Sequence, residues 1–208
     1  MRPVPSWPDK PWLTIWVAPR GTMRRILDSD PTRHVLLLAA MYGMSISFVP
    51  RGNIFGNFLP VWAVLLLAFT AGPLVGIIAI YISGAIFRWS GSVLGGRATT
   101  EEVRAAFAWS SVPQILSVVL WLLPGFALYG TEIITGAGPR MAGNPLPLLL
   151  GLVPRLILAF WGEFLQIKTL AEAHQFSAWR SLAALFLALL IIFMPLFLLL
   201  LLLVGLRP

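Results

Sequence analysis

The chain has 208 residues, and its composition is unlike that of a water-soluble domain. Hydrophobic residues make up 58% and charged residues 11% of it, against about 45–50% and about 25% in soluble domains. These proportions exclude soluble enzymes, disulfide scaffolds and disordered proteins, and the absence of cysteine excludes thiol chemistry and thiolate metal sites. The net charge of +7 is not gathered into a large basic cluster, so we expect no nucleic-acid partner.

The first ten residues contain three prolines, and no apolar run of signal-peptide length follows before Arg20. A cleaved signal peptide needs such a run directly after its basic start. We therefore expect no signal peptide, and we expect the first membrane span to serve as the targeting signal.

Residues 11–31 (PWLTIWVAPRGTMRRILDSDP) predict two short helices that begin at Pro11 and Pro19. Tryptophans beside arginines are typical of an amphipathic helix in the headgroup layer, where indoles anchor and guanidinium groups meet lipid phosphate. The residues expected at this surface are Trp12, Trp16, Arg20, Arg24 and Arg25. A second interpretation, compatible with the first, is a lid packed over the cytoplasmic ends of the spans.

Long stretches without charge predict the membrane spans. Residues 52–87, 105–131 and 181–206 form uncharged runs of 36, 27 and 26 residues. A helix needs about 20 residues to cross the hydrocarbon core, and these Leu-rich runs are too long for the strands of a barrel. With two less uniform segments, we expect five spans, at about 34–50, 59–87, 105–125, 147–170 and 181–206.

The distribution of Lys and Arg predicts the orientation of the spans. Five spans place eleven Lys and Arg residues on one side and three on the other, whereas the split is nine to five if residues 34–50 do not cross. Positive residues collect on the cytoplasmic side, so we expect a multi-pass inner-membrane protein with a cytoplasmic N-terminus and an external C-terminus. The expected fold is all-α: a cytoplasmic tail with an interfacial helix at 1–33, and a five-helix transmembrane bundle at 34–208.

The connection before the third span carries a helix-start signal. Gly95-Gly96 interrupts the chain, and Thr99 with Glu102 matches the Ser/Thr-x-x-Glu capping box, so a helix is expected to begin near Thr100. Pro113 then predicts a kink inside the membrane, because proline lacks the main-chain N–H of a helical residue.

Polar side chains surround this expected kink, namely Ser110, Ser111 and Gln114. One interpretation is structural: the three side chains satisfy main-chain groups that the kink releases. The other is functional: they form a polar lining near the cytoplasmic third of the bundle.

Two ionisable residues fall inside the fourth expected span, where a charge is costly unless it is paired or reaches water. Arg155 is expected to extend back to the outer interface. Glu163 is expected to meet a partner on another helix, at the depth of the serines near Pro113. The candidate intramembrane polar site therefore comprises Glu163, Arg155, Gln114, Ser110, Ser111 and Arg88.

Three roles remain open for Glu163. It is a hydrogen-bonded carboxyl that holds helices together, part of a proton- or cation-linked pocket, or an interfacial residue if the span boundaries lie elsewhere. None of these roles requires a cofactor.

The fourth connection contains Ser177 as a helix N-cap and Trp179-Arg180 as an interfacial anchor. His34, Glu172 and His174 all lie near the same expected membrane edge. Their spacing matches no metal-binding pattern, so we expect no metal site.

Three blocks of the chain resemble the bacterial branch of the Ypt-interacting-protein (Yip) family of five-span membrane proteins. They are residues 11–31, GGRATTEEVRAAFAWSSVPQ (95–114) and AEAHQFSAWRSL (171–182), with Gly95, Gly96, Thr99, Glu102 and Pro113 inside the most specific block. The resemblance implies a helical bundle with a cytoplasmic N-terminus. Eukaryotic relatives act with small prenylated GTPases and associate with one another, but their Asp-Leu-Tyr-Pro-Tyr signature is absent here, so that activity is not carried over.

Two functions follow from these observations. The first is a non-enzymatic membrane-organising or adaptor protein that self-associates or binds other membrane proteins and contacts anionic lipid headgroups. The alternative is a small transporter or channel for an ion, solute or lipid, built around Glu163. An enzyme is not expected, because the sequence shows no nucleophile with a positioned base.

Overall fold

The computed structural model describes residues 7–48, 59–135, 139–140, 144 and 146–205, and these residues form helices and connections without a strand. The first six residues of the expected tail and the ends of the first and last expected spans (49–50 and 206) lie outside the described residues. Arg51 and Arg207, used in the charge count, also lie outside them.

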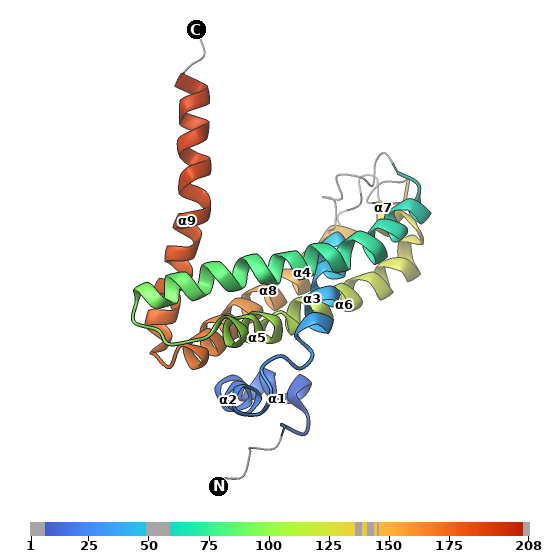
Figure 1. Cartoon of the computed structure of the whole chain (residues 1–208). Helices are drawn as coiled ribbons and strands as arrows, with labels where there is room; N and C mark the ends of the chain where they lie inside the picture. Colours follow the sequence, from blue (N-terminus) through green and yellow to red (C-terminus); the bar gives the residue numbers. More distant parts are fainter. Residues whose placement is uncertain (1–6, 49–58, 136–138, 141–143, 145, 206–208) are drawn as a thin grey trace.

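The helices are α1 (Pro11–Val17), α2 (Pro19–Ser29), α3 (Val35–Ser47), α4 (Val61–Val93), α5 (Thr100–Ser110), α6 (Val112–Tyr129), α7 (Glu132–Thr135), α8 (Leu146–Ala173) and α9 (Ala178–Gly205). The long helices α4 and α8 and the consecutive pair α5–α6 run beside one another, and α3 packs onto α4 (Figure 1). Helices α1 and α2 lie across one side of this bundle. Helix α9 contacts α4 and α8 only near its start and then stands away from them.

Helices α3 and α4 approach each other through glycines. A Cβ atom on Gly43 would overlap the main-chain oxygen of Gly72, and one on Gly76 would overlap the main-chain oxygen of Ala39. Small residues spaced four apart allow such close contact between helices in membranes. Glycine therefore sets the separation of these two helices.

Three helical segments are long and apolar enough to cross a membrane: α4, the stretch Thr100–Tyr129 that contains α5 and α6, and residues Ala178–Pro195 of α9. Helix α3 has 13 residues and is about 20 Å long, which is short of the roughly 30 Å hydrocarbon core. Helix α8 has 28 residues, which is a sufficient length, but it carries Arg155 and Glu163. The chain is an all-helical membrane protein, and the number of five spans stays a prediction.

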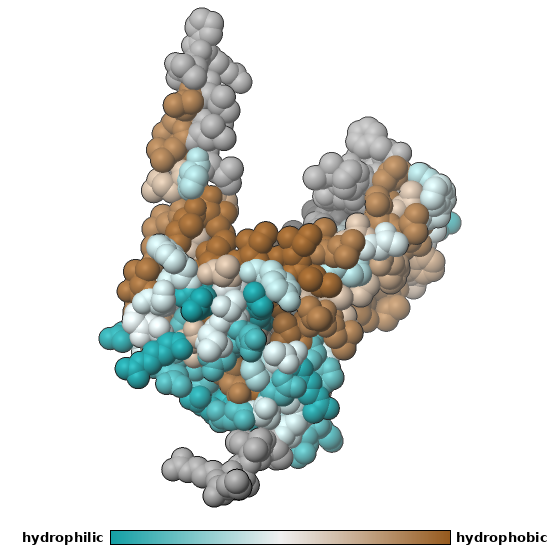
Figure 2. All heavy atoms as spheres, viewed as in Figure 1, coloured by the Kyte–Doolittle hydropathy of each residue, from teal (hydrophilic) through white to brown (hydrophobic). Residues whose placement is uncertain are grey.

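Two exposed tryptophans lie near the ends of α4, where the two interfacial layers of a membrane are expected. Trp62 is 68% and Trp89 is 52% exposed, and they lie about 40 Å apart along the helix at about 1.5 Å per residue. This separation equals the thickness of a bilayer with its interfacial layers, about 40–45 Å, and tryptophan favours those layers. Hydrophobic residues cover the bundle and α9, whereas hydrophilic residues gather at the end that carries α1 and α2 (Figure 2).

The helix starts follow the local chemistry of the sequence. Helices α1 and α2 begin at Pro11 and Pro19, as expected. The Thr99–Glu102 capping box forms, with each side chain bonded to the main-chain N–H of the other residue. The Ser177 Oγ accepts the Arg180 N–H at 3.4 Å, which caps α9.

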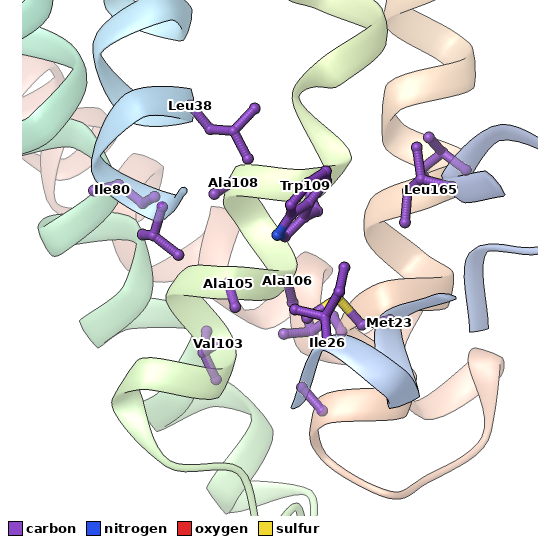
Figure 3. Close-up of a cluster of buried hydrophobic side chains, with 14 of the residues drawn as sticks. Met23, Ile26, Leu38, Ile80, Val103, Ala105, Ala106, Ala108, Trp109 and Leu165 are labelled. Atoms are coloured by element: carbon purple, nitrogen blue, oxygen red, sulfur yellow. The ribbon is translucent and has the colours of Figure 1, made fainter. Parts of the chain in front are cut away.

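The N-terminal helices pack as a lid on the bundle. Ile15, Met23 and Ile26 have no exposed surface, and Met23 and Ile26 lie beside Ala106 of α5 (Figure 3). Arg24 Nε of α2 also lies 2.9 Å from Glu172 Oε1 of α8. The face of α1 and α2 that meets the bundle is therefore packed as the lid interpretation expects.

The other side of the lid keeps features of a membrane-surface helix. Leu13 and Val17 of α1 are 65% and 84% exposed, and the side chains of Arg20 and Arg25 are exposed as well. Trp12 and Trp16, by contrast, are partly buried against the core. Anchoring of this face in the headgroup layer stays a prediction.

Candidate functional site

Two contacts between helices relate the position of Glu163 to that of Trp89. Gly162 packs against the main-chain oxygen of Ser110 on α5. Ser110 lies about 9 Å along α5 from Arg104, whose side chain crosses Gly84 of α4, and Gly84 lies about 8 Å from Trp89. If Trp89 lies at an interface, Glu163 is expected about 17 Å from that level, and its place inside the membrane stays a prediction.

The Glu163 side chain lies on the surface of α8, near enough to α3 for its charge to reach Tyr42. It is exposed on α8 among Phe160, Trp161 and Phe164, which are 72%, 39% and 41% exposed. It makes no hydrogen bond or ion pair with any of the described residues. Tyr42 on α3 lies near enough to Glu163 and Arg155 for both charges to act on its hydroxyl group.

Arg155 binds the end of a neighbouring helix. Its Nη1 donates a hydrogen bond of 3.1 Å to the main-chain oxygen of Phe48, the residue that follows α3. The last carbonyl groups of a helix lack partners within the helix and carry partial negative charge, so a guanidinium group is a favourable partner there. The half-buried Arg155 thus joins α8 to α3.

The serines near Pro113 bond to their own helix. Ser110 Oγ donates to the Phe107 oxygen at 2.8 Å, and Ser111 Oγ donates to the Ala108 oxygen at 2.7 Å. Helix α5 ends at Ser110 and α6 begins at Val112, so the interruption falls directly before Pro113. These contacts support the structural interpretation of the two serines. Gln114 is partly buried and does not bond to Glu163.

The structure therefore brings together only part of the expected polar set. Arg155 and Glu163 both lie near Tyr42, whereas Arg88 lies near the far end of α4, in a pocket with Arg97. Sequence reasoning missed Tyr42, because a single tyrosine in an apolar segment carries no pattern that indicates its neighbours.

A second polar group lies at the end of α8, where His174 is buried with 1% exposure. Its imidazole ring fills the space beside Gly91 and Gly96, and a Cβ atom on either glycine would overlap the ring. The Arg97 N–H donates to the His174 main-chain oxygen at 3.3 Å, and the Gly96 N–H donates to the Gly91 oxygen at 2.8 Å. The ring thus holds the connection between α4 and α5 against α8.

Burial lowers the pKa of the His174 imidazole, because a charged ring is poorly solvated there. The main chain of Phe87 and the charge of Glu102 oppose this shift without cancelling it. His174 is therefore a neutral packing group at neutral pH. The sequence predicted Gly96 only as a helix breaker. Its second role, to leave space for the His174 ring, depends on the packing of α8 against this connection.

The residues considered for a metal site are separated in the structure. His34 lies in an aromatic cluster with Trp7, Trp12 and Trp109, and Glu172 pairs with Arg24. Within the ranges described, no group of three or more metal-ligating side chains occurs. Trp179 and Arg180 at the start of α9 are exposed, with Trp179 at 80%.

The family comparison covers nearly the whole chain. A family model described as the Yip1 domain matches residues 13–201. No curated protein and no solved structure matches the chain.

Proposed function

Because the chain belongs to the Yip1-domain family, we propose that it is a non-enzymatic membrane-organising or adaptor protein. In this role it associates laterally with a second copy or with another membrane protein. The contact surface is the outer face of α8 around Glu163, which we call the α8 face: Phe160, Glu163 and Phe164.

The observation that carries this proposal is the position of Glu163. A carboxyl group in hydrocarbon costs several kcal/mol unless it is paired or solvated. Glu163 is expected inside the membrane, is exposed, and makes no hydrogen bond or ion pair with the described residues. A partner helix that covers the α8 face and donates a hydrogen bond to the carboxyl group removes this cost, and the surrounding aromatic rings add apolar contact area.

The same proposal includes five spans in the inner membrane, a cytoplasmic N-terminus and an external C-terminus. The charge distribution supports this arrangement, because it places eleven Lys and Arg residues on the cytoplasmic side. A pair of reporter fusions at Arg97 and Arg140 tests it. The first position is expected inside the cell and the second outside.

Self-association is tested by energy transfer between donor- and acceptor-labelled copies in nanodiscs or vesicles. The wild type is expected to show transfer that unlabelled copies compete away, and Glu163→Leu is expected to reduce it. Glu163→Gln should retain it, because an amide still forms hydrogen bonds. Glu101→Leu, on the exposed first turn of α5, is the matched control. Equal transfer in the wild type and Glu163→Leu contradicts the role of Glu163.

Transport of an ion, small solute or lipid is a second candidate. The observation that favours it is the position of Tyr42 on α3, which lies near enough to Glu163 and Arg155 of α8 for both charges to act on its hydroxyl group. Reconstituted vesicles test it directly. Under this candidate Glu163→Gln abolishes a pH-dependent flux while the protein stays folded, and absence of flux for the wild type across an ion and lipid panel excludes it.

A further inference from the structure

A pocket of about 540 Å³ opens beside the connection between α4 and α5. Ala85, Arg88, Trp89 and Ser92 of α4 line one side of it, and Arg97 and Thr100 line the other. This pocket lies apart from Glu163 and the α8 face, and neither proposed function uses it.

The pocket carries positive charge without a counter-ion. Arg88 and Arg97 form no ion pair with any residue that the structure describes, and both side chains are exposed. The neighbouring Glu102 is bonded to the Thr99 N–H in the capping box and does not line the pocket. Thr100 begins α5, but the first turn of that helix carries Glu101 and Glu102, so the positive charge of the pocket comes from the two arginines. Two guanidinium groups that line one pocket favour a phosphate group.

The loop that carries Arg97 is fixed by contacts with the end of α8. His174 packs against Gly96, and its main-chain oxygen accepts the Arg97 N–H. The Gly96 N–H is bonded to Gly91 at the end of α4. The main chain at Arg97 is therefore already ordered, so less conformational entropy is lost when the residue binds an anion.

The level of the pocket matches the headgroup layer. Trp89, which is expected at an interface, forms part of its wall. From Ala85, an exposed apolar stripe runs along α4 into the membrane through Ile82 and Ile78, which are 56% and 58% exposed. A ligand with a phosphate group and an acyl chain can bind the arginines in the pocket and cover this apolar stripe at the same time.

We propose that this pocket binds the phosphate headgroup of an anionic glycerophospholipid, with Arg88 and Arg97 as the phosphate-binding residues. An acyl chain of the lipid lies along Ala85, Ile82 and Ile78. The pocket binds a single lipid molecule, whereas the arginines of the lid are expected to contact a charged membrane surface as a whole.

Native mass spectrometry of the detergent-purified protein, titrated with phosphatidylglycerol or phosphatidylcholine, tests the site. The wild type is expected to bind one phosphatidylglycerol at least about tenfold more tightly than phosphatidylcholine. Arg88→Gln/Arg97→Gln should lose this preference. The control Arg20→Gln/Arg25→Gln removes the same charge from the exposed face of the lid and should keep the affinity within about twofold.

Two further measurements separate the lipid from a free phosphate and from general charge effects. Ala85→Trp keeps both arginines but fills the pocket wall, and it should weaken phosphatidylglycerol binding at least about tenfold without lowering the unfolding midpoint. Inorganic phosphate should compete weakly, because it lacks the acyl chain. The proposal is overturned if both lipids bind equally, if the control variant loses as much affinity as the pocket variant, or if inorganic phosphate binds as tightly as the lipid.

Discussion

Arg155 and Phe48, which are 107 residues apart in the sequence, are joined by a hydrogen bond from Nη1 to the main-chain oxygen across 3.1 Å. The bond fastens the middle of α8 to the end of the short helix α3. It gives a charged residue within an apolar segment a structural purpose, because it satisfies a carbonyl group that α3 leaves free.

Replacing Arg155 by Leu is expected to destabilise the protein by about 1–3 kcal/mol, because the Phe48 oxygen loses its charged donor while remaining buried. Unfolding by sodium dodecyl sulfate in mixed micelles measures the change. Arg20→Leu, on the exposed lid surface, serves as the control and should cost little. An Arg155→Leu protein as stable as the wild type contradicts a structural role for the bond.

The contact between Gly91 and His174 predicts that the effect of Gly91→Ala on the free energy of unfolding changes sign when the His174 ring is removed. Gly91→Ala should destabilise the wild type by about 1–3 kcal/mol, because the new methyl group overlaps the imidazole ring. In a His174→Ala background the same substitution should stabilise by about 0.5–1 kcal/mol, since alanine is the better helix former and the ring is gone. A double-mutant cycle of unfolding free energies measures both values. Equal effects in the two backgrounds would show that the ring does not occupy this space.

Stability should depend on pH through His174. Its pKa is lowered by burial, so the unfolded chain binds a proton more readily than the folded protein. The stability that the neutral ring contributes is complete above about pH 6.5, the usual histidine value, and declines as the pH falls toward the lowered pKa. The slope is at most about 1.4 kcal/mol per pH unit. Comparing the wild type with His174→Ala between pH 7.5 and 5 measures it, and identical pH profiles would refute the assignment.

The lid should depend on apolar burial more than on its ion pair. Ile26 has no exposed surface, and Ile26→Ala should cost about 2–5 kcal/mol. The Arg24–Glu172 pair is partly exposed, at 40% and 22%, so Arg24→Gln should cost less than about 1 kcal/mol. Trypsin cleavage at Arg20 and Arg25 reports release of the lid. Faster cleavage in Arg24→Gln than in Ile26→Ala would reverse this order.

Features that depend on neighbouring residues could be predicted from the sequence. The starts at Pro11 and Pro19 rest on the fixed φ angle of proline. The Thr99–Glu102 box and the Ser177 cap each bond a main-chain group three residues away, so the local pattern contains the whole interaction. The interruption before Pro113 has the same local origin.

Features that depend on distant segments could not be predicted. The Arg155–Phe48 bond and the seat of His174 against Gly91 exist only because helices far apart in the chain pack together. The apolar face of α2 was visible, but an amphipathic pattern does not distinguish burial against protein from burial in lipid. The orientation of Glu163 likewise depends on how α8 is rotated against α5.

Photocrosslinking in native membranes tests the proposed association most directly, because the chain has no cysteine and an introduced cysteine is its single labelled position. Benzophenone attached at Phe160→Cys, on the α8 face, is expected to join the protein to a second copy or to another membrane protein. The matched position Ile78→Cys, exposed on α4, is expected to crosslink mainly lipid. Addition of Glu163→Leu should abolish the protein crosslink at Phe160→Cys. Protein crosslinks of equal yield at both positions, or lipid alone at both, would contradict a partner seated on Glu163.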